Sequence, residues 1–128
     1  TVNGSLLRWC KNAISSEGYE AMTDILLSAY SFDMRPTAVF CGNDNLAYGA
    51  LKAIQHHGLR CPEDISIIGV DNCLEICEKT TPNLSSVDKN FDLAGKKIAQ
   101  VLCNEKWENN VSIIKCNLII RESVQEIN

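Results

Sequence analysis

Apolar and polar residues alternate along this chain with two periods, and the changes between them outline a series of helices and strands. Residues 15–30 carry apolar positions at helical spacing, among them Met22 and Leu26, so we expect a first helix there. A second helix is predicted between Asp44 and Gly58, because a glycine commonly ends a helix. Gly49 lies inside that helix at a cost of about 1 kcal/mol relative to alanine, which indicates close packing at this position.

Short apolar runs rich in β-branched residues separate the helices and predict strands. The predicted strands are 37–41, 65–70 and 84–87, followed by a final β stretch at 111–121; a short helix is expected at 73–79 and an amphipathic helix at 90–106. Strands that alternate with helices favour a parallel sheet with both faces covered. The pattern therefore predicts an α/β fold of three layers, a parallel sheet with helices on both faces.

Composition excludes several classes of protein. Of the 128 residues, 45% are hydrophobic and 22% are charged, which is typical of a globular domain. The formal net charge of −4 argues against nucleic-acid binding by this chain alone, because phosphate contacts need a positive surface. No apolar run is long enough for a membrane span. The chain begins with Thr1 and carries no signal peptide, so we expect it to start inside a longer gene product.

Seven cysteines are present, an odd number that cannot pair completely within one chain. There is no CxxC motif, and no histidine near Cys73 and Cys77 completes a zinc set. We therefore expect reduced thiols that pack as small apolar side chains, a cytoplasmic location, and no metal site.

Polar pairs follow two of the predicted strands. Asn43 and Asp44 come after the strand at 37–41, and Asp71 and Asn72 come after the strand at 65–70. Ligands bind at the carboxyl ends of strands in open α/β sheets, and these groups suit the hydroxyls of a sugar. The alternative is that the first pair caps a helix and the second forms a turn. No nucleophile, phosphate-loop or dinucleotide motif is present, so we expect neither an enzyme nor a cofactor.

These stretches resemble the signatures of bacterial transcriptional repressors related to the lactose and galactose repressors, the LacI type. The matching blocks read PTAVF at 36–40, ND at 43–44, LAYGA at 46–50, GLRCPEDISIIGVDN at 58–72, PNLSSV at 82–87, LAG at 93–95 and RES at 121–123. Their order and spacing fit the family over residues 15–124. The resemblance implies one lobe of a periplasmic-binding-protein-like domain that binds an effector.

The same resemblance implies a domain organisation. Residues 1–128 would form the C-terminal part of the effector-binding domain, without the helix-turn-helix headpiece and without most of the N-terminal lobe. Residues 88–110 would be a crossover that belongs to the absent lobe. Operator DNA would then be bound only through the headpiece.

The resemblance also implies roles for individual residues. Asn43 and Asp71 match positions that contact the effector, and Lys89 and Phe91 match positions that line the cleft. A homodimer interface would include Tyr48, Leu74 and Ile76. Where the family often carries a ligand-stacking aromatic residue, this chain has Ala13.

The function that the sequence predicts is a ligand-sensing lobe, with a sugar or sugar derivative as the effector and allosteric coupling to operator binding. The alternative is a periplasmic sugar-binding protein of an uptake system. The seven unpaired cysteines count against that alternative, because the periplasm oxidises thiols.

Overall fold

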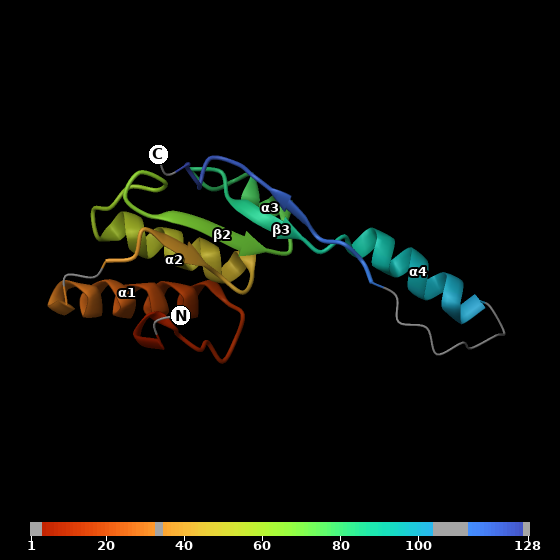
Figure 1. The fold of residues 1–128 in the computed structure, drawn as a ribbon, viewed down its shortest axis with the longest axis horizontal. Coiled ribbons are helices and arrows are strands. Elements are labelled where there is room, and N and C mark those ends of the chain that lie inside the picture. Colours follow the sequence, from red (N-terminus) through yellow and green to blue (C-terminus); the bar gives the residue numbers. More distant parts are fainter. Residues whose placement is uncertain (1–3, 33–34, 104–112, 127–128) are drawn as a thin grey trace.

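A computed structural model describes residues 4–32, 35–103 and 113–126 of the chain (Figure 1). The elements in chain order are η1 (Gly4–Leu6), α1 (Ser15–Phe32), β1 (Ala38–Phe40), α2 (Asp44–His56), β2 (Ser66–Val70), α3 (Leu74–Cys77), β3 (Ser85–Asp88), α4 (Phe91–Cys103) and β4 (Asn117–Ile119). Each predicted helix and strand is present, and most ends differ by one to three residues. The final β stretch predicted at 111–121 is a strand only over Asn117–Ile119. The predicted positions 104–106 and 111–112 lie outside the described residues.

The sheet has the strand order β1-β2-β3-β4. The first three strands are parallel, with Val39 opposite Ile67 and Gly69 opposite Ser86. β4 departs from the predicted parallel arrangement, because it pairs antiparallel with β3. The chain leaves the sheet at the carboxyl end of β3 and returns beside the same end, so β4 can only run the opposite way. The predicted α/β class with a sheet dominated by parallel strands is confirmed.

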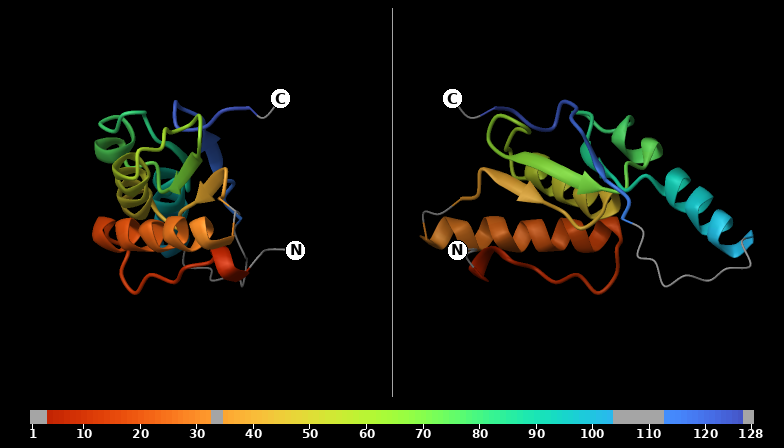
Figure 2. Two further views of the ribbon diagram at one scale, coloured as in Figure 1. Left: turned by 90° about the vertical axis from the view of Figure 1, so that its left-hand side faces the viewer. Right: turned by 45° about the vertical axis from the view of Figure 1, so that its right-hand side comes forward.

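Helices α1 and α2 lie side by side, and α2 packs against β2 on one face of the sheet (Figure 2). α3 lies next to α2 on the same face. The opposite face carries Phe40, which is 69% exposed. Within the part of the chain that the structure describes, the helical layer predicted for this second face is not found.

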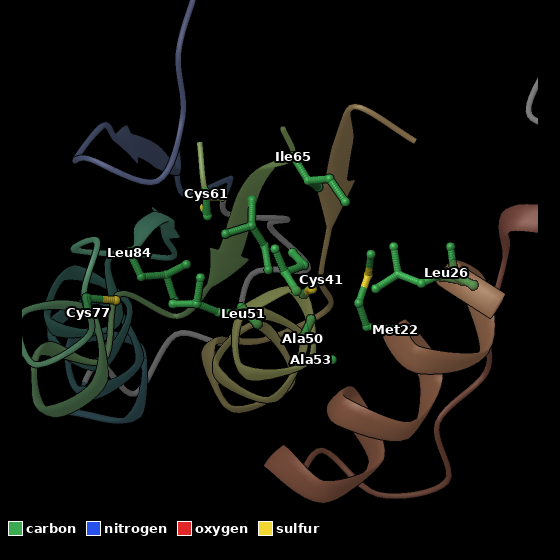
Figure 3. Packing of buried hydrophobic residues seen from close by; sticks show 14 residues of the cluster. Met22, Leu26, Cys41, Ala50, Leu51, Ala53, Cys61, Ile65, Cys77 and Leu84 are labelled. Carbon is green, nitrogen blue, oxygen red and sulfur yellow. The ribbon is translucent and has the colours of Figure 1, made fainter. Parts of the chain in front are cut away.

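The core lies between α2, β2 and the inner side of α1 (Figure 3). Its fully buried members include Met22, Leu26, Leu51, Ile54, Ile65, Ile67, Cys77 and Leu84. The predicted apolar stripes of the first two helices therefore face one another and the sheet. Burying such side chains contributes about 1.5–3 kcal/mol each.

Two glycines allow α1 and α2 to approach closely. A Cβ atom on Gly49 would lie 1.8 Å from the backbone oxygen of Ser15, and one on Gly18 would lie 2.2 Å from the backbone oxygen of Leu46. The close packing that the sequence predicts at Gly49 is confirmed.

Helix α4 extends away from the sheet and from the other helices (Figure 1). None of its residues is buried. Its large apolar side chains are exposed, namely Phe91, Leu93, Ile98, Val101 and Leu102. Phe91, Ile98, Val101 and Leu102 lie on one side of the helix, and we refer to these four residues as the α4 apolar face.

Candidate functional site

The structure brings together three of the four predicted effector residues. Asp71 directly follows β2, Lys89 directly follows β3, and the two strands are neighbours in the sheet. The Lys89 Nζ lies 2.6 Å from the Asp71 Oδ1, and the two side chains are 42% and 34% exposed. Parallel neighbours end at one edge of the sheet, which explains why residues 18 positions apart form an ion pair.

Phe91 completes this group. The Lys89 Nζ lies over the Phe91 ring, 5.6 Å from its centroid. The ring itself is 60% exposed, because it begins α4 at the point where that helix leaves the sheet. An acceptor, a cation and an open aromatic surface therefore meet at one place. We call Asp71, Lys89 and Phe91 the acid–base–ring cluster.

The backbone that carries Asp71 has an uncommon conformation. Asp71 has φ of 108° and Asn72 has φ of 53°, values that residues other than glycine rarely adopt. Such residues persist where surrounding contacts hold them, and they gather at ligand sites. Aspartate and asparagine also adopt such values in turns, so this conformation fits both the turn alternative and a ligand site, and the effector role of Asp71 stays a prediction.

Arg121 is a further residue at this site that the sequence did not single out for a ligand role. It follows β4, and its Nη2 donates to the Asn72 Oδ1 at 2.7 Å. Its Nη1 donates to the backbone oxygen of Leu84 at 2.8 Å. The only sign of Arg121 in the sequence was its place in the RES block, and that match implied no contact with Asn72.

Asn43 is arranged as the capping alternative predicts. Its Oδ1 accepts a hydrogen bond from the Leu46 backbone nitrogen at 2.8 Å, which caps α2. Its Nδ2 donates to the backbone oxygen of Ala13 at 3.2 Å. Asn43 also follows the carboxyl end of β1, which neighbours β2, the strand that Asp71 follows. An effector contact by Asn43 stays a prediction.

The predicted dimer residues lie at or near the surface. Tyr48 and Leu74 are exposed, and Ile76 packs against the edge of the core. The Lys52 Nζ lies 5.4 Å from the centre of the Tyr48 ring. Their role in an interface stays a prediction.

The cysteines divide into buried and exposed groups. All seven are free thiols; Cys41, Cys61 and Cys77 are buried, whereas Cys103 and Cys116 are exposed. Burial raises the pKa of the Cys41 thiol to about 12. Burial, together with the Asp44 carboxylate beside it, raises the pKa of the Cys77 thiol to about 12. The buried thiols behave as the small apolar side chains that the sequence predicts. Over the described ranges, no group of three or more histidine, cysteine or acidic side chains is arranged to hold a metal ion.

An apolar groove of about 530 Å³ lies elsewhere in the molecule, between the segment 6–10, α1 and β1. None of the four predicted effector residues lines it. The acid–base–ring cluster and this groove are therefore at different places. We take the cluster as the candidate ligand site, because the lining of the groove is mainly apolar.

Comparison with known proteins shows which family the chain belongs to. The model of the periplasmic binding protein-like domain matches residues 6–124. The chain belongs to that family. The chain is 42% identical over 113 residues to the HTH-type transcriptional repressor PurR of Pasteurella multocida (strain Pm70). The aligned part covers 85% of this chain and 32% of that repressor.

Solved structures of transcriptional regulators are also similar to this chain. The transcriptional regulator CelR in complex with cellobiose superposes with a TM-score of 0.85 at 27% identity, over 96% of this chain and 37% of that chain. A sugar-binding transcriptional regulator of the LacI family from Escherichia coli, solved with phosphate, gives a TM-score of 0.81 at 26% identity, over 97% of this chain and 44% of that chain. The predicted resemblance to the effector-binding domain of LacI-type regulators is confirmed.

The chain spans 30–37% of the length of the curated relatives that it matches. Among residues 4–32, 35–103 and 113–126, no helix combines the length and the apolar character that a membrane span requires.

Proposed function

We propose that this chain is the ligand-sensing part of a bacterial LacI-type transcriptional regulator, and that the acid–base–ring cluster binds its effector. The observation that carries the proposal is the meeting of Asp71, Lys89 and Phe91 where β2, β3 and α4 come together. The proposed effector is a sugar or a sugar derivative. Cellobiose is bound by one structural relative, and another relative is described as sugar-binding, which supports this class.

The chemistry of the cluster suits a polyhydroxylated ligand. The Asp71 carboxylate can accept hydrogen bonds from two hydroxyls, and the Lys89 ammonium can donate to a ring or hydroxyl oxygen. The open Phe91 ring offers an apolar surface for the face of a sugar. Because Lys89 and Asp71 already neutralise one another, an uncharged ligand finds its partners without an unpaired charge at the site.

In the proposed mechanism the effector changes an equilibrium and no bond is made or broken. A ligand that binds one arrangement of the effector domain more tightly shifts the population towards it. The change would reach operator DNA through a separate headpiece, since a net charge of −4 does not favour DNA binding by this chain. We further propose a homodimer through Tyr48, Leu74 and Ile76, a cytoplasmic location, and no enzymatic activity.

The test is Asp71→Ala in the full-length gene product, with cellobiose, glucose 6-phosphate and guanosine as probes. Hydrogen bonds to a charged acceptor contribute about 1.5–3 kcal/mol each, so losing one weakens binding about tenfold or more. The melting temperature should change little, because the carboxylate is partly solvated. Calorimetry and thermal melting on the same samples give both quantities.

Glu20→Ala is the matched control, because Glu20 is an exposed carboxylate on α1. It should leave both affinity and melting temperature unchanged. If Asp71→Ala lowers the melting temperature and leaves affinity intact, Asp71 stabilises its turn and the site assignment is wrong. If the parent protein binds guanosine and neither cellobiose nor glucose 6-phosphate, the proposed effector class is wrong.

A further inference from the structure

Asp44 is a buried carboxylate that the effector contacts leave unexplained. It is the first residue of α2, yet its side chain turns inward and is only 2% exposed. Burying a charged carboxylate is costly unless hydrogen bonds replace the lost water. Its partners therefore indicate what the fold gains from it.

The hydrogen bonds of Asp44 all come from residues around the loop that carries Asp71. Its Oδ2 accepts from the Cys73 backbone nitrogen at 2.7 Å and from the Cys77 thiol at 3.4 Å. Its Oδ1 accepts from the Ser86 hydroxyl at 2.6 Å. Bonds to an ionised acceptor are about twice as strong as those between neutral groups.

Ser86 extends this contact into the loop. Its oxygen accepts a hydrogen bond from the Asn72 backbone nitrogen at 3.0 Å while its own hydrogen points to Asp44. The Asp71 backbone nitrogen donates to the Val87 backbone oxygen at 2.9 Å. The three successive nitrogens of residues 71–73 are thus all bound, two of them by Asp44 directly or through Ser86.

The residues around Asp44 restrict both the position of its carboxylate and the conformation of the 71–73 loop. A Cβ atom on Gly69 would lie 2.2 Å from the Asp44 Oδ1, so only glycine leaves room for the carboxylate there. The loop also holds two successive residues with positive φ, a conformation that must be supported from outside. The Asp44 carboxylate supplies that support through its hydrogen bonds with the Cys73 nitrogen and the Ser86 hydroxyl.

We infer that Asp44 is a positioning residue for the effector site: it fixes the backbone of residues 71–73 and so holds the Asp71 carboxylate against Lys89. This inference rests on the proposed function, because it assigns Asp44 a role in placing a proposed ligand contact. Asp44 is buried and is not itself a proposed ligand contact.

The test uses Asp44→Asn in the labelled protein without any effector. The amide has nearly the same shape, but its NH₂ group replaces one oxygen and so faces donors instead of accepting from them. We expect the Cys73 amide to exchange with solvent at least tenfold faster relative to amides inside α2. We also expect the Lys89 ε-methylene resonance to lose its shift from the Phe91 ring and to approach its position in Asp71→Ala.

Asp64→Asn is a matched control at the other end of β2. The Asp64 carboxylate also accepts from a loop nitrogen, that of Arg60, at 2.8 Å. This variant should speed exchange of the Arg60 amide and leave the Cys73 amide and Lys89 unchanged. A merely structural contribution of Asp44 would lower global stability and leave the Lys89 resonance in place in the folded protein.

A second variant decides the matter if Asp44→Asn does not fold. Ser86→Ala removes only the hydroxyl between Asp44 and the Asn72 nitrogen, and should speed Asn72 exchange and shift the Lys89 resonance. Unchanged exchange and an unchanged Lys89 resonance in a folded variant would overturn the inference. These measurements need no effector, so a failure of ligand binding at Asp71 is recognised separately.

Discussion

Asn43 and Asp44 are adjacent in the sequence, but their side chains point to opposite sides of the start of α2. Asn43 stays near the surface and caps α2 through the Leu46 nitrogen. Asp44 points inward and binds groups that are 29 to 42 residues away in the chain. One residue therefore starts the helix, and the next ties it to the loop at the end of β2.

Buried thiols make the stability of the folded protein depend on pH in the alkaline range. The pKa of Cys41 is raised to about 12 in the folded state, against an ordinary value of 9.0. The folded chain therefore keeps this proton when the unfolded chain has lost it. Stability from this group is fully present below pH 9 and is lost as the pH rises towards 12. We expect the urea midpoint to fall between pH 8 and pH 10.5, and to fall less steeply in Cys41→Ala.

Cys103→Ala serves as the comparison, because this thiol is exposed at the end of α4. Its dependence on pH should match that of the parent protein. If Cys41→Ala and the parent protein lose stability equally between the two pH values, the buried thiol does not contribute.

At the scale of the elements, glycine positions separate the packed helices from the unpacked one. Gly49 in α2 faces the backbone of α1, whereas a Cβ atom on Gly95 in α4 would meet nothing within 4 Å. The same substitution should therefore act in opposite directions. Gly49→Ala should destabilise the fold by roughly 1–3 kcal/mol through overpacking. Gly95→Ala should favour α4 by up to about 1 kcal/mol.

Urea unfolding and helical circular dichroism of the two variants check this pair. Gly49→Ala should lower the unfolding midpoint, and Gly95→Ala should keep or raise the helical signal. A neutral Gly49→Ala would mean that α1 and α2 are not packed as closely as described.

The periodicity of the chain was sufficient to predict where helices and strands form, because local spacing decides that. It could not predict the direction of β4, which follows from the point where the chain returns to the sheet. The strand ends indicated Asp71, whereas Lys89 and Phe91 were implied only by the resemblance to the family. The periodicity gave no sign that Ser86 and Arg121 contact the 71–73 loop, because hydrogen bonds between distant positions leave no local pattern.

At the scale of the whole molecule, the α4 apolar face has no partner within the described residues. Exposed apolar patches of this kind drive association. We expect the protein to form a dimer or a larger assembly, and Ile98→Glu to reduce its size. Sedimentation velocity measures this directly, and Ile98 is exposed, so its replacement should not unfold the chain.

Gln100→Glu adds the same charge at an exposed position outside the α4 apolar face and should leave the assembly unchanged. If Ile98→Glu still forms a dimer and Leu74→Glu abolishes it, the proposed interface with Tyr48 and Ile76 carries the dimer. A parent protein that sediments at 14.2 kDa at high concentration would contradict both expectations.

The antiparallel pairing of β3 and β4 makes the stretch that contains α4 an insertion in the topological sense. Asp88 and Asn117 are partners across the ladder, so the chain leaves and re-enters the sheet at neighbouring points. A gap of that width is what a two-residue hairpin closes. The sheet therefore places no demand on the length or structure of what lies between these two residues. Evolution could lengthen, exchange or remove the insert without altering the register of the strands that support Asp71.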